Sequence, residues 1–161
     1  MSYIMADTYV ILHNIRSAHN VGSIFRTADG AGVVKIFLTG YTPSPVDRFG
    51  REHPEIKKTS LGAAEIVTYE VVPDIQELIL RLKHEGIFIV AVEQTNNALD
   101  YAKFEREELT AYIFGNEVTG IEKEVLQEVG QHLMIPMHGT KESLNVSVCA
   151  GIILFNIQKN N

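Results

Sequence analysis

Short apolar runs alternate with amphipathic stretches along the whole chain, and this alternation constrains the fold more than any other feature. KIFLT at Lys35–Thr39 and IFIVAV at Ile87–Val92 are almost continuously apolar and do not alternate between apolar and polar residues. Such runs are typical of parallel strands that are covered on both faces of a sheet. The pattern predicts strands at Thr8–His13, Lys35–Thr39, Ile66–Val71, Ile87–Val92, Ala111–Phe114 and His132–Pro136.

The segments between these strands carry the spacing and the end signals of helices. Asp74 follows a proline and precedes Glu77 by three residues, which predicts a capped helix running to about His84 and stopping at Gly86. Residues 41–54 contain three of the five prolines and are predicted to form a loop. The other predicted helices are Val21–Ala31 with Asn20 as its N-cap, Lys57–Glu65, Ile121–Val129 and Ser143–Ile157.

This alternation predicts an α/β fold with a mainly parallel sheet flanked by helices. The chain of 161 residues has the length of one domain and shows no internal repeat and no linker. Residues 1–161 are therefore interpreted as a single domain.

Several classes of protein are excluded by what the sequence lacks. One cysteine rules out an intrachain disulfide, and six scattered histidines show no metal-ligand spacing, so no metal is expected. There is no dinucleotide-binding glycine motif, no P-loop and no hydrolase elbow. The first residues do not form a secretory signal, and no apolar run approaches the roughly 20 residues of a membrane span. We therefore expect a cytoplasmic protein with no membrane contact.

Polar residues follow the first predicted strand in the segment NIRSAHNVGSIFRTADGAG, residues 14–32. Arg26 lies six residues after Asn20, nearly two turns into the predicted helix, among small residues that let a ligand approach. Taken alone, this pattern fits an asparagine N-cap and a surface arginine equally well.

Two further segments follow strands in the same way. FGNEVTGIEKEV, residues 114–125, is a glycine-containing turn whose backbone amides suit an adenosine moiety, although an ordinary strand–turn–helix connection explains it as well. In IPMHGTKESLNVSVCAGI, residues 135–152, Ser143 as an N-cap explains part of the pattern. It does not explain Asn145, which is expected inside the first turn of an apolar helix, where asparagine is a poor choice.

Together, the segments NVGSIFRTADGAG, IFGNEVTGI and IPMHGTKESLNVSVCAGI resemble the three motifs of the SPOUT superfamily, and within it the TrmH-like RNA ribose 2′-O-methyltransferases. The resemblance covers essentially the whole chain. It implies a C-terminal trefoil knot, a homodimer with shared active sites, S-adenosylmethionine as cofactor and S-adenosylhomocysteine as product. Larger members of the family carry an extra N-terminal RNA-binding domain or helical extensions, whereas motif one begins here within the first 20 residues, so we expect a single catalytic domain with no accessory RNA-binding domain. By motif position, the cofactor contacts fall near Gly115, Ile135, Met137, Ser143 and Leu144.

The functional positions of the family match Arg26, Asn20, Glu117, Ser143 and Asn145. As a hypothesis, Arg26 binds the ribose-phosphate and polarises the 2′-hydroxyl, because a role as base would need a strongly depressed pKa. Asn20 then holds the arginine or the ribose, and Glu117 orients either Arg26 or the neighbouring loop. Ser143 and Asn145 shape the pocket, and Asn145 helps to hold the substrate.

Contacts to RNA are predicted at Arg16, Arg48, Arg51, Lys57 and Lys58, although acidic residues are interleaved with the last four and a solvated loop explains them equally well. The net charge of −6 counts against a simple nucleic-acid binder, but a local basic face can still steer RNA. Cys149 is expected in the core. His13 and His138 are expected near the site without a catalytic role.

The resemblance favours structured RNA as the substrate, tRNA before rRNA, and the acidic balance leaves room for a helper protein. Three other functions stay open at this point. They are a SPOUT base methyltransferase, a non-catalytic module that binds RNA or S-adenosylmethionine, and an unrelated α/β enzyme acting on a small molecule. The sequence does not indicate which RNA, nucleotide or position is modified.

Overall fold

The computed structural model describes residues 6–156, and its centre is a parallel sheet. Seven strands within this range lie in the order β3-β2-β1-β6-β4-β7-β5, and every pairing between them is parallel. The carboxyl ends of all the strands therefore meet at one edge. The strands are β1 (Asp7–His13), β2 (Lys35–Thr39), β3 (Tyr69–Val71), β4 (Phe88–Val92), β5 (Leu99–Asp100), β6 (Leu109–Phe114) and β7 (Gln131–Met134).

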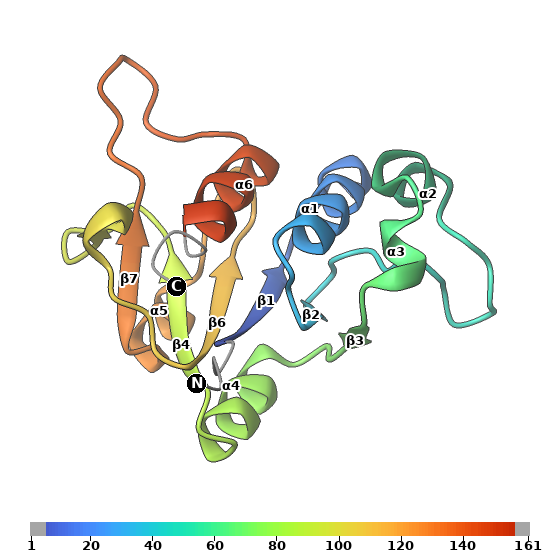
Figure 1. Cartoon of the computed structure of the whole chain (residues 1–161), viewed down its shortest axis with the longest axis horizontal. Coiled ribbons are helices and arrows are strands. Elements are labelled where there is room, and N and C mark those ends of the chain that lie inside the picture. The colour runs from blue at the N-terminus through green and yellow to red at the C-terminus, as the bar shows by residue number, and fades with distance from the viewer. Residues whose placement is uncertain (1–5, 157–161) are drawn as a thin grey trace, which may run out of the picture.

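Helices cover both faces of this sheet (Figure 1). They are α1 (Ala18–Gly30), α2 (Pro54–Ser60), α3 (Ala63–Ile66), α4 (Ile75–His84), α5 (Lys123–Glu128) and α6 (Val146–Asn156), with a short 3-10 helix at Tyr101–Lys103. Val10 and Leu12 of β1 join the core that contains α1, α2, α3 and α6. Ile11, between them, joins the core that contains α4 and α5. Two-sided burial explains why the strands are continuously apolar, so the predicted α/β class is confirmed.

Four predicted helix starts differ from the observed ones, which are Ala18, Pro54, Lys123 and Val146 in place of Val21, Lys57, Ile121 and Ser143. Helix α1 begins at Ala18, and its N-cap is Ser17, whose hydroxyl accepts the N–H of Asn20 at 3.2 Å. Helix α6 begins at Val146, and Asn145 directly before it accepts the N–H of Ser147 at 2.9 Å. Asn145 thus has the capping position that was predicted for Ser143, which resolves the unfavourable asparagine inside the helix. The predicted helix end at Ile157 lies outside the described residues.

Other boundaries differ for local reasons. The helix predicted at Lys57–Glu65 is divided into α2 and α3 at Leu61 and Gly62, both of which have positive φ. The strand predicted from Ile66 is only β3, because α3 includes Ile66. Strand β5 and the 3-10 helix were not predicted. The Asp74 cap is confirmed, since its carboxylate accepts the N–H groups of Gln76 and Glu77.

Helix α6 packs against α1 and is buried along only part of its surface. Ala150, Ile153 and Leu154 are buried, whereas Val148 and Phe155 are about half exposed, at 51% and 48%. None of the helices in residues 6–156 is long and apolar enough to cross a membrane.

Candidate functional site

A cleft opens at the carboxyl edge of the sheet, beyond β4, β6 and β7. The segment from Ile135 to Asn145, which forms the long loop between β7 and α6 in Figure 1, contributes to its wall. Its empty volume is about 710 Å³, including the part that is open to solvent. All five residues predicted to bind the cofactor line this cleft, namely Gly115, Ile135, Met137, Ser143 and Leu144.

The turn after β6 forms one side of the cleft, and its geometry requires glycine. A Cβ at Gly115 would lie 2.5 Å from the Ile121 side chain and 2.9 Å from the Gly120 backbone. Asn116 closes the turn, because its side-chain oxygen accepts the N–H groups of Val118 and Thr119, each at 2.9 Å. The turn is therefore compact and held by its own hydrogen bonds.

Residues that follow β4, the strand between β6 and β7, connect the two sides of the cleft. The Glu93 carboxylate accepts the N–H of Ile121 at 2.9 Å, and the Gln94 amide donates to the Ile135 carbonyl at 2.9 Å. Cys149 packs against the core, as predicted, and it also lines the cleft. Burial, aided by the negative charge of Glu93, raises the pKa of its thiol to about 12, so the thiol stays protonated at neutral pH.

Glu117 lies between the cleft and the start of α1. Its carboxylate accepts the N–H groups of Arg16 at 3.0 Å and Ser17 at 3.1 Å, and the side-chain amide of Asn20 at 3.2 Å. Burial acts to raise the pKa of Glu117, but these donors outweigh it and the pKa is lowered. A charged acceptor at the amino end of a helix is also favoured by the helix dipole.

Asn20 connects this carboxylate to the third motif. Its side-chain oxygen accepts from the Asn145 amide at 3.2 Å, so Glu117, Asn20 and Asn145 form one chain of hydrogen bonds. Of the two roles predicted for Glu117, the structure shows contact with the neighbouring loop and not with Arg26. Asn20 was predicted to hold either Arg26 or the ribose. Its side chain contacts Glu117 and Asn145 and does not contact Arg26.

Arg26 and Ser143 are not part of this network. Both are exposed, and neither side chain makes a hydrogen bond or an ion pair with any residue in the described range 6–156. Arg26 lies on α1, two turns from the helix start, and Ser143 lines the cleft. The structure therefore brings together three of the five predicted catalytic residues and leaves the other two available to ligands.

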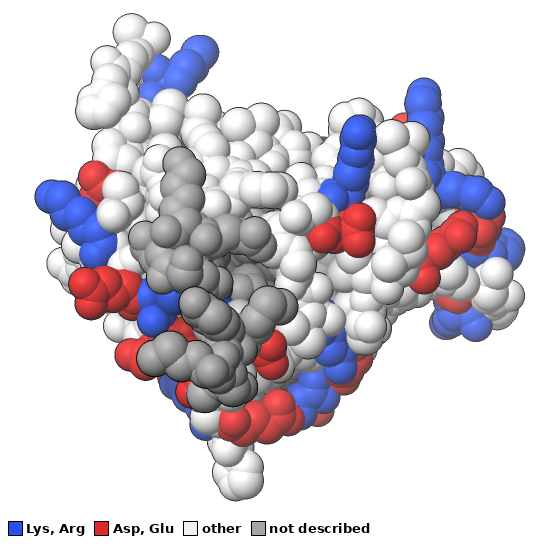
Figure 2. All heavy atoms as spheres, in the orientation of Figure 1, with Lys and Arg blue, Asp and Glu red and all other residues white. Residues whose placement is uncertain are grey.

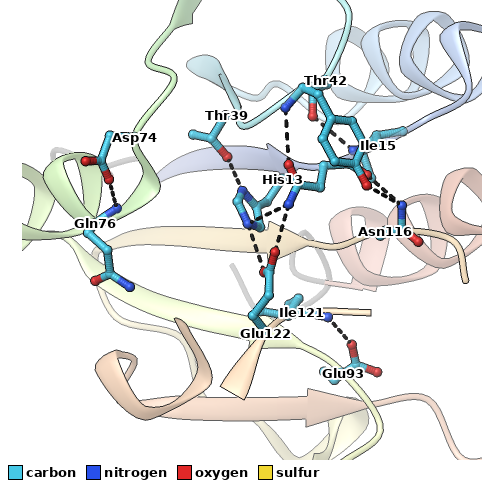
Figure 3. A network of polar contacts seen from close by, with 12 residues as sticks. His13, Ile15, Thr39, Thr42, Asp74, Gln76, Glu93, Asn116, Ile121 and Glu122 are labelled. Carbon is cyan, nitrogen blue, oxygen red and sulfur yellow. Dashed lines mark hydrogen bonds and ion pairs between the residues drawn. The ribbon is translucent and has the colours of Figure 1, made fainter. Parts of the chain in front are cut away.

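A second polar network joins the ends of β1 and β2 to the turn after β6 (Figure 3). The buried His13 ring hydrogen-bonds with Thr39 at 2.8 Å and with the Glu122 carboxylate at 2.9 Å. The Asn14 amide donates to the other Glu122 oxygen at 2.8 Å. Burial lowers the pKa of His13, although the Glu122 charge opposes this.

The same network reaches the loop after β2. The Asn116 amide donates to the Asn14 carbonyl at 3.0 Å and to the Tyr41 hydroxyl at 2.9 Å. Sequence reasoning assigned no role to Glu122 or Tyr41. Their position just after strands that end at the same sheet edge is the signal that could have indicated them.

The residues predicted to bind RNA are all exposed, but they differ in their partners. Arg51 pairs with Asp47 at 2.7 Å and Lys57 pairs with Glu52 at 2.6 Å. Arg16, Arg48 and Lys58 have no ion pair within the described residues. Figure 2 shows lysines and arginines projecting beside acidic groups at the side of the molecule where α2 and the 41–54 loop lie, without a continuous basic stripe.

The fold and the cleft define a class of α/β proteins with a ligand site at the carboxyl edge of a parallel sheet. The chain belongs to the SpoU rRNA Methylase family, whose model matches residues 7–155. Within residues 6–156, no three histidine, cysteine, aspartate or glutamate side chains are grouped so that they could hold a metal ion.

Among curated proteins, a tRNA (guanosine(18)-2′-O)-methyltransferase of Thermus thermophilus is 33% identical over 153 residues, 95% of this chain and 75% of the relative. The 23S rRNA (guanosine-2′-O-)-methyltransferase RlmB of Neisseria meningitidis is 32% identical over 90% of this chain and 55% of its own length. The crystal structure of an AdoMet-bound rRNA methyltransferase from Sinorhizobium meliloti matches with a TM-score of 0.86 and 28% identity, covering 97% of this chain and 57% of that one. The chain thus spans between about half and three quarters of these relatives.

Proposed function

We propose that this chain is an S-adenosylmethionine-dependent methyltransferase that modifies a ribose 2′-hydroxyl of structured RNA, either tRNA or rRNA. The single observation that carries the proposal is the coincidence of two sites. The cleft that all five predicted cofactor residues line adjoins the hydrogen-bonded chain of Glu117, Asn20 and Asn145. The names of the relatives, which describe 2′-O-methylation of tRNA and rRNA, support this reaction.

The residues of the cleft fit S-adenosylmethionine. Apolar side chains that line the cleft, such as Ile135, Met137 and Leu144, can contact an adenine ring. Gly115 leaves room where any Cβ would fill the space. When bound, the cofactor supplies an activated methyl group on a sulfonium centre. The protonated thiol of Cys149 does not compete as a nucleophile, because the thiolate is the reactive form.

In this proposal, the chain positions the hydroxyl and stabilises the charge that develops on its oxygen, and the hydroxyl proton passes to solvent as the methyl group is transferred. Arg26 is assigned to the ribose-phosphate and the 2′-hydroxyl, because its guanidinium is exposed and has no partner within residues 6–156. The positive charge of its guanidinium polarises the hydroxyl. Glu117 and Asn20 act by fixing the start of α1, on which Arg26 lies, relative to the cleft. Ser143 and Asn145 are assigned to the substrate side of the pocket.

We also propose that two copies associate through the exposed side of α6. Val148 and Phe155 leave an apolar face there, and Arg26 lies on α1, the helix against which α6 packs. A partner that contributes to each site would complete the surroundings of Arg26 and Ser143. We also propose the trefoil knot that the family resemblance implies. The strand order is consistent with it, because β6 lies between β1 and β4 and the chain then continues to β7 on the far side of β4. The described residues would then be one catalytic domain acting in the cytoplasm, where its RNA substrates are, with or without a helper protein.

Transfer of labelled methyl from S-adenosylmethionine to unmodified tRNA and rRNA, followed by digestion to nucleosides, tests the proposal. We expect a labelled 2′-O-methylnucleoside, and a rate reduced about 100- to 1,000-fold in Arg26→Ala. Lys83→Ala, which removes an exposed cation from α4 on the other face of the sheet, is the control and should keep its rate. A labelled base would indicate a base methyltransferase. Cofactor binding without incorporation into either RNA would indicate a binding module.

A further inference from the structure

The loop between β2 and α2 carries an aromatic side chain that neither core uses. Phe49 is 67% exposed, although aromatic side chains usually contribute to cores or interfaces. It lies at the tip of a turn whose two sides are joined by an antiparallel bridge between Val46 and Glu52. A single exposed apolar residue is ordinary, but Phe49 differs because the turn that carries it is held by specific hydrogen bonds.

Asp47 organises the turn around Phe49. Its carboxylate accepts the backbone N–H groups of Phe49 at 2.8 Å and Arg51 at 2.9 Å, and the Nε of Arg51 at 2.7 Å. The Gly50 N–H donates to the Asp47 carbonyl at 3.0 Å, with Gly50 at a φ of +78° that favours glycine. These bonds hold the tip in one conformation and leave the ring exposed.

Two guanidinium groups lie against the Phe49 ring. The Cζ atoms of Arg48 and Arg51 are 4.7 Å and 5.1 Å from the ring centroid, which is cation–π distance. Asp47 already neutralises Arg51, whereas Arg48 has no ion pair within residues 6–156. A phenyl ring combined with a planar guanidinium is the kind of surface on which unstacked nucleobases stack.

The base of this loop is attached to the candidate site. The Tyr41 hydroxyl accepts from Asn116 at 2.9 Å, and the Thr42 hydroxyl accepts the N–H of Ile15 at 3.0 Å. The loop therefore begins at the same sheet edge as the cleft, and in Figure 1 it runs outside α2 and α3, on the side away from α6. An RNA that places one nucleotide at the cleft can extend along this edge to the tip of the loop.

From these observations we infer that Phe49 and Arg48 form a stacking platform for an unpaired nucleobase of the RNA, outside the reaction site. The inference rests on the proposed function for the identity of the ligand. The charges around the tip favour RNA bound by stacking over an acidic protein. Arg51 and Lys57 are paired, and Asp47, Glu52 and Glu55 lie nearby in the sequence, so little net positive charge remains to attract an acidic chain.

The chain contains no tryptophan, so Phe49→Trp places a single indole fluorophore at the tip of the loop. The probes are a pool of unmodified tRNA transcripts, which have unpaired loops, and a fully paired RNA duplex. We expect the tRNA pool to quench the fluorescence of Trp at this position and the duplex to leave it unchanged. In Phe49→Ala, the affinity for the tRNA pool should fall about 5- to 100-fold, the range for loss of one stacked base.

Leu80→Ala is the matched control, because Leu80 on α4 is 65% exposed, close to the 67% of Phe49. It should bind the tRNA pool as the wild type does. Equal affinities for Phe49→Ala and the wild type, or quenching by the duplex as strong as by tRNA, would overturn the platform. Methyl transfer by the wild type without quenching in Phe49→Trp would overturn the platform alone. Quenching without methyl transfer to tRNA or rRNA would overturn the proposed activity and support the platform.

Discussion

The two ends of the carboxyl edge are built in opposite ways. Beyond β4, β6 and β7, the cleft is bounded by groups that hydrogen-bond to one another. The carboxylate of Glu117, for example, accepts hydrogen bonds from three donors. Beyond β2, the 41–54 loop is largely exposed, and near its tip Asp47 and Glu52 pair with basic side chains of the same surface. A site for chemistry needs groups held in position before the substrate arrives. A surface that binds RNA needs to extend away from the reaction site and to carry exposed contact groups.

This difference predicts that substitutions at the cleft reduce cofactor binding or stability, whereas substitutions on the loop reduce RNA binding and leave both unchanged. Two of the variants lie at the cleft, and the third lies on α2, which directly follows the loop.

The largest effect is expected from Gly115→Val. Its Cβ would lie 2.5 Å from Ile121 and 2.9 Å from the Gly120 backbone, so the turn has to move. Because such overpacking costs about 1–3 kcal/mol, we expect S-adenosylhomocysteine to bind about 10- to 100-fold more weakly by calorimetry. Gly139→Val is the control, since no atom lies within 4 Å of a Cβ there. Equal losses of affinity in both variants would show that the turn does not shape the cofactor site.

A smaller effect is expected from Glu117→Ala, which leaves the Arg16 and Ser17 N–H groups and the Asn20 amide without their acceptor. We expect the free energy of unfolding in urea at pH 7 to fall by about 1–3 kcal/mol. Glu105→Ala, which removes an exposed carboxylate without a hydrogen bond in the described residues, should change it by less than about 0.5 kcal/mol.

The pH dependence of the Glu117 effect has a definite sign. Because the folded-state pKa of Glu117 is lowered from 4.5, its contribution is complete above that pH and is lost as the pH falls through the folded-state value. The difference between wild type and Glu117→Ala should therefore shrink in acid. A difference that stays constant below pH 4.5 would mean that the ionised carboxylate is not what stabilises the start of α1.

The smallest effect is expected on the loop side of the comparison. Lys58→Ala removes an exposed cation without an ion pair in residues 6–156, so the free energy of unfolding should change by less than about 0.5 kcal/mol. If Lys58 contacts a phosphate, the slope of log affinity for tRNA against log salt should decrease by about 1. Lys83→Ala should leave the slope unchanged. A loss of stability in Lys58→Ala would contradict the prediction that substitutions at this end of the sheet edge affect RNA binding and leave stability unchanged.

Individual residues show which hydrogen-bond partners the local sequence can predict and which it cannot. Asp74 was predicted as an N-cap and is one, because its partners are the N–H groups two and three residues later. Asn20 was also predicted as an N-cap, but that position belongs to Ser17. The Asn20 side chain instead bonds to Glu117 and Asn145, which are 97 and 125 residues away along the chain. Local sequence does not indicate such partners.

The sequence by itself determined the α/β class and the approximate position of most strands and, through the resemblance of its motifs to a known family, five of the residues that line the cleft. These properties depend on burial, on glycine and proline, and on motif order, all of which are visible along the chain. Only the tertiary structure decided the partners of Glu117, Asn20 and His13, and the exposure of Phe49 beside two guanidinium groups. The reason is physical, because a polar side chain bonds to whatever donor or acceptor lies within about 3 Å after folding. That distance is fixed by how the elements pack.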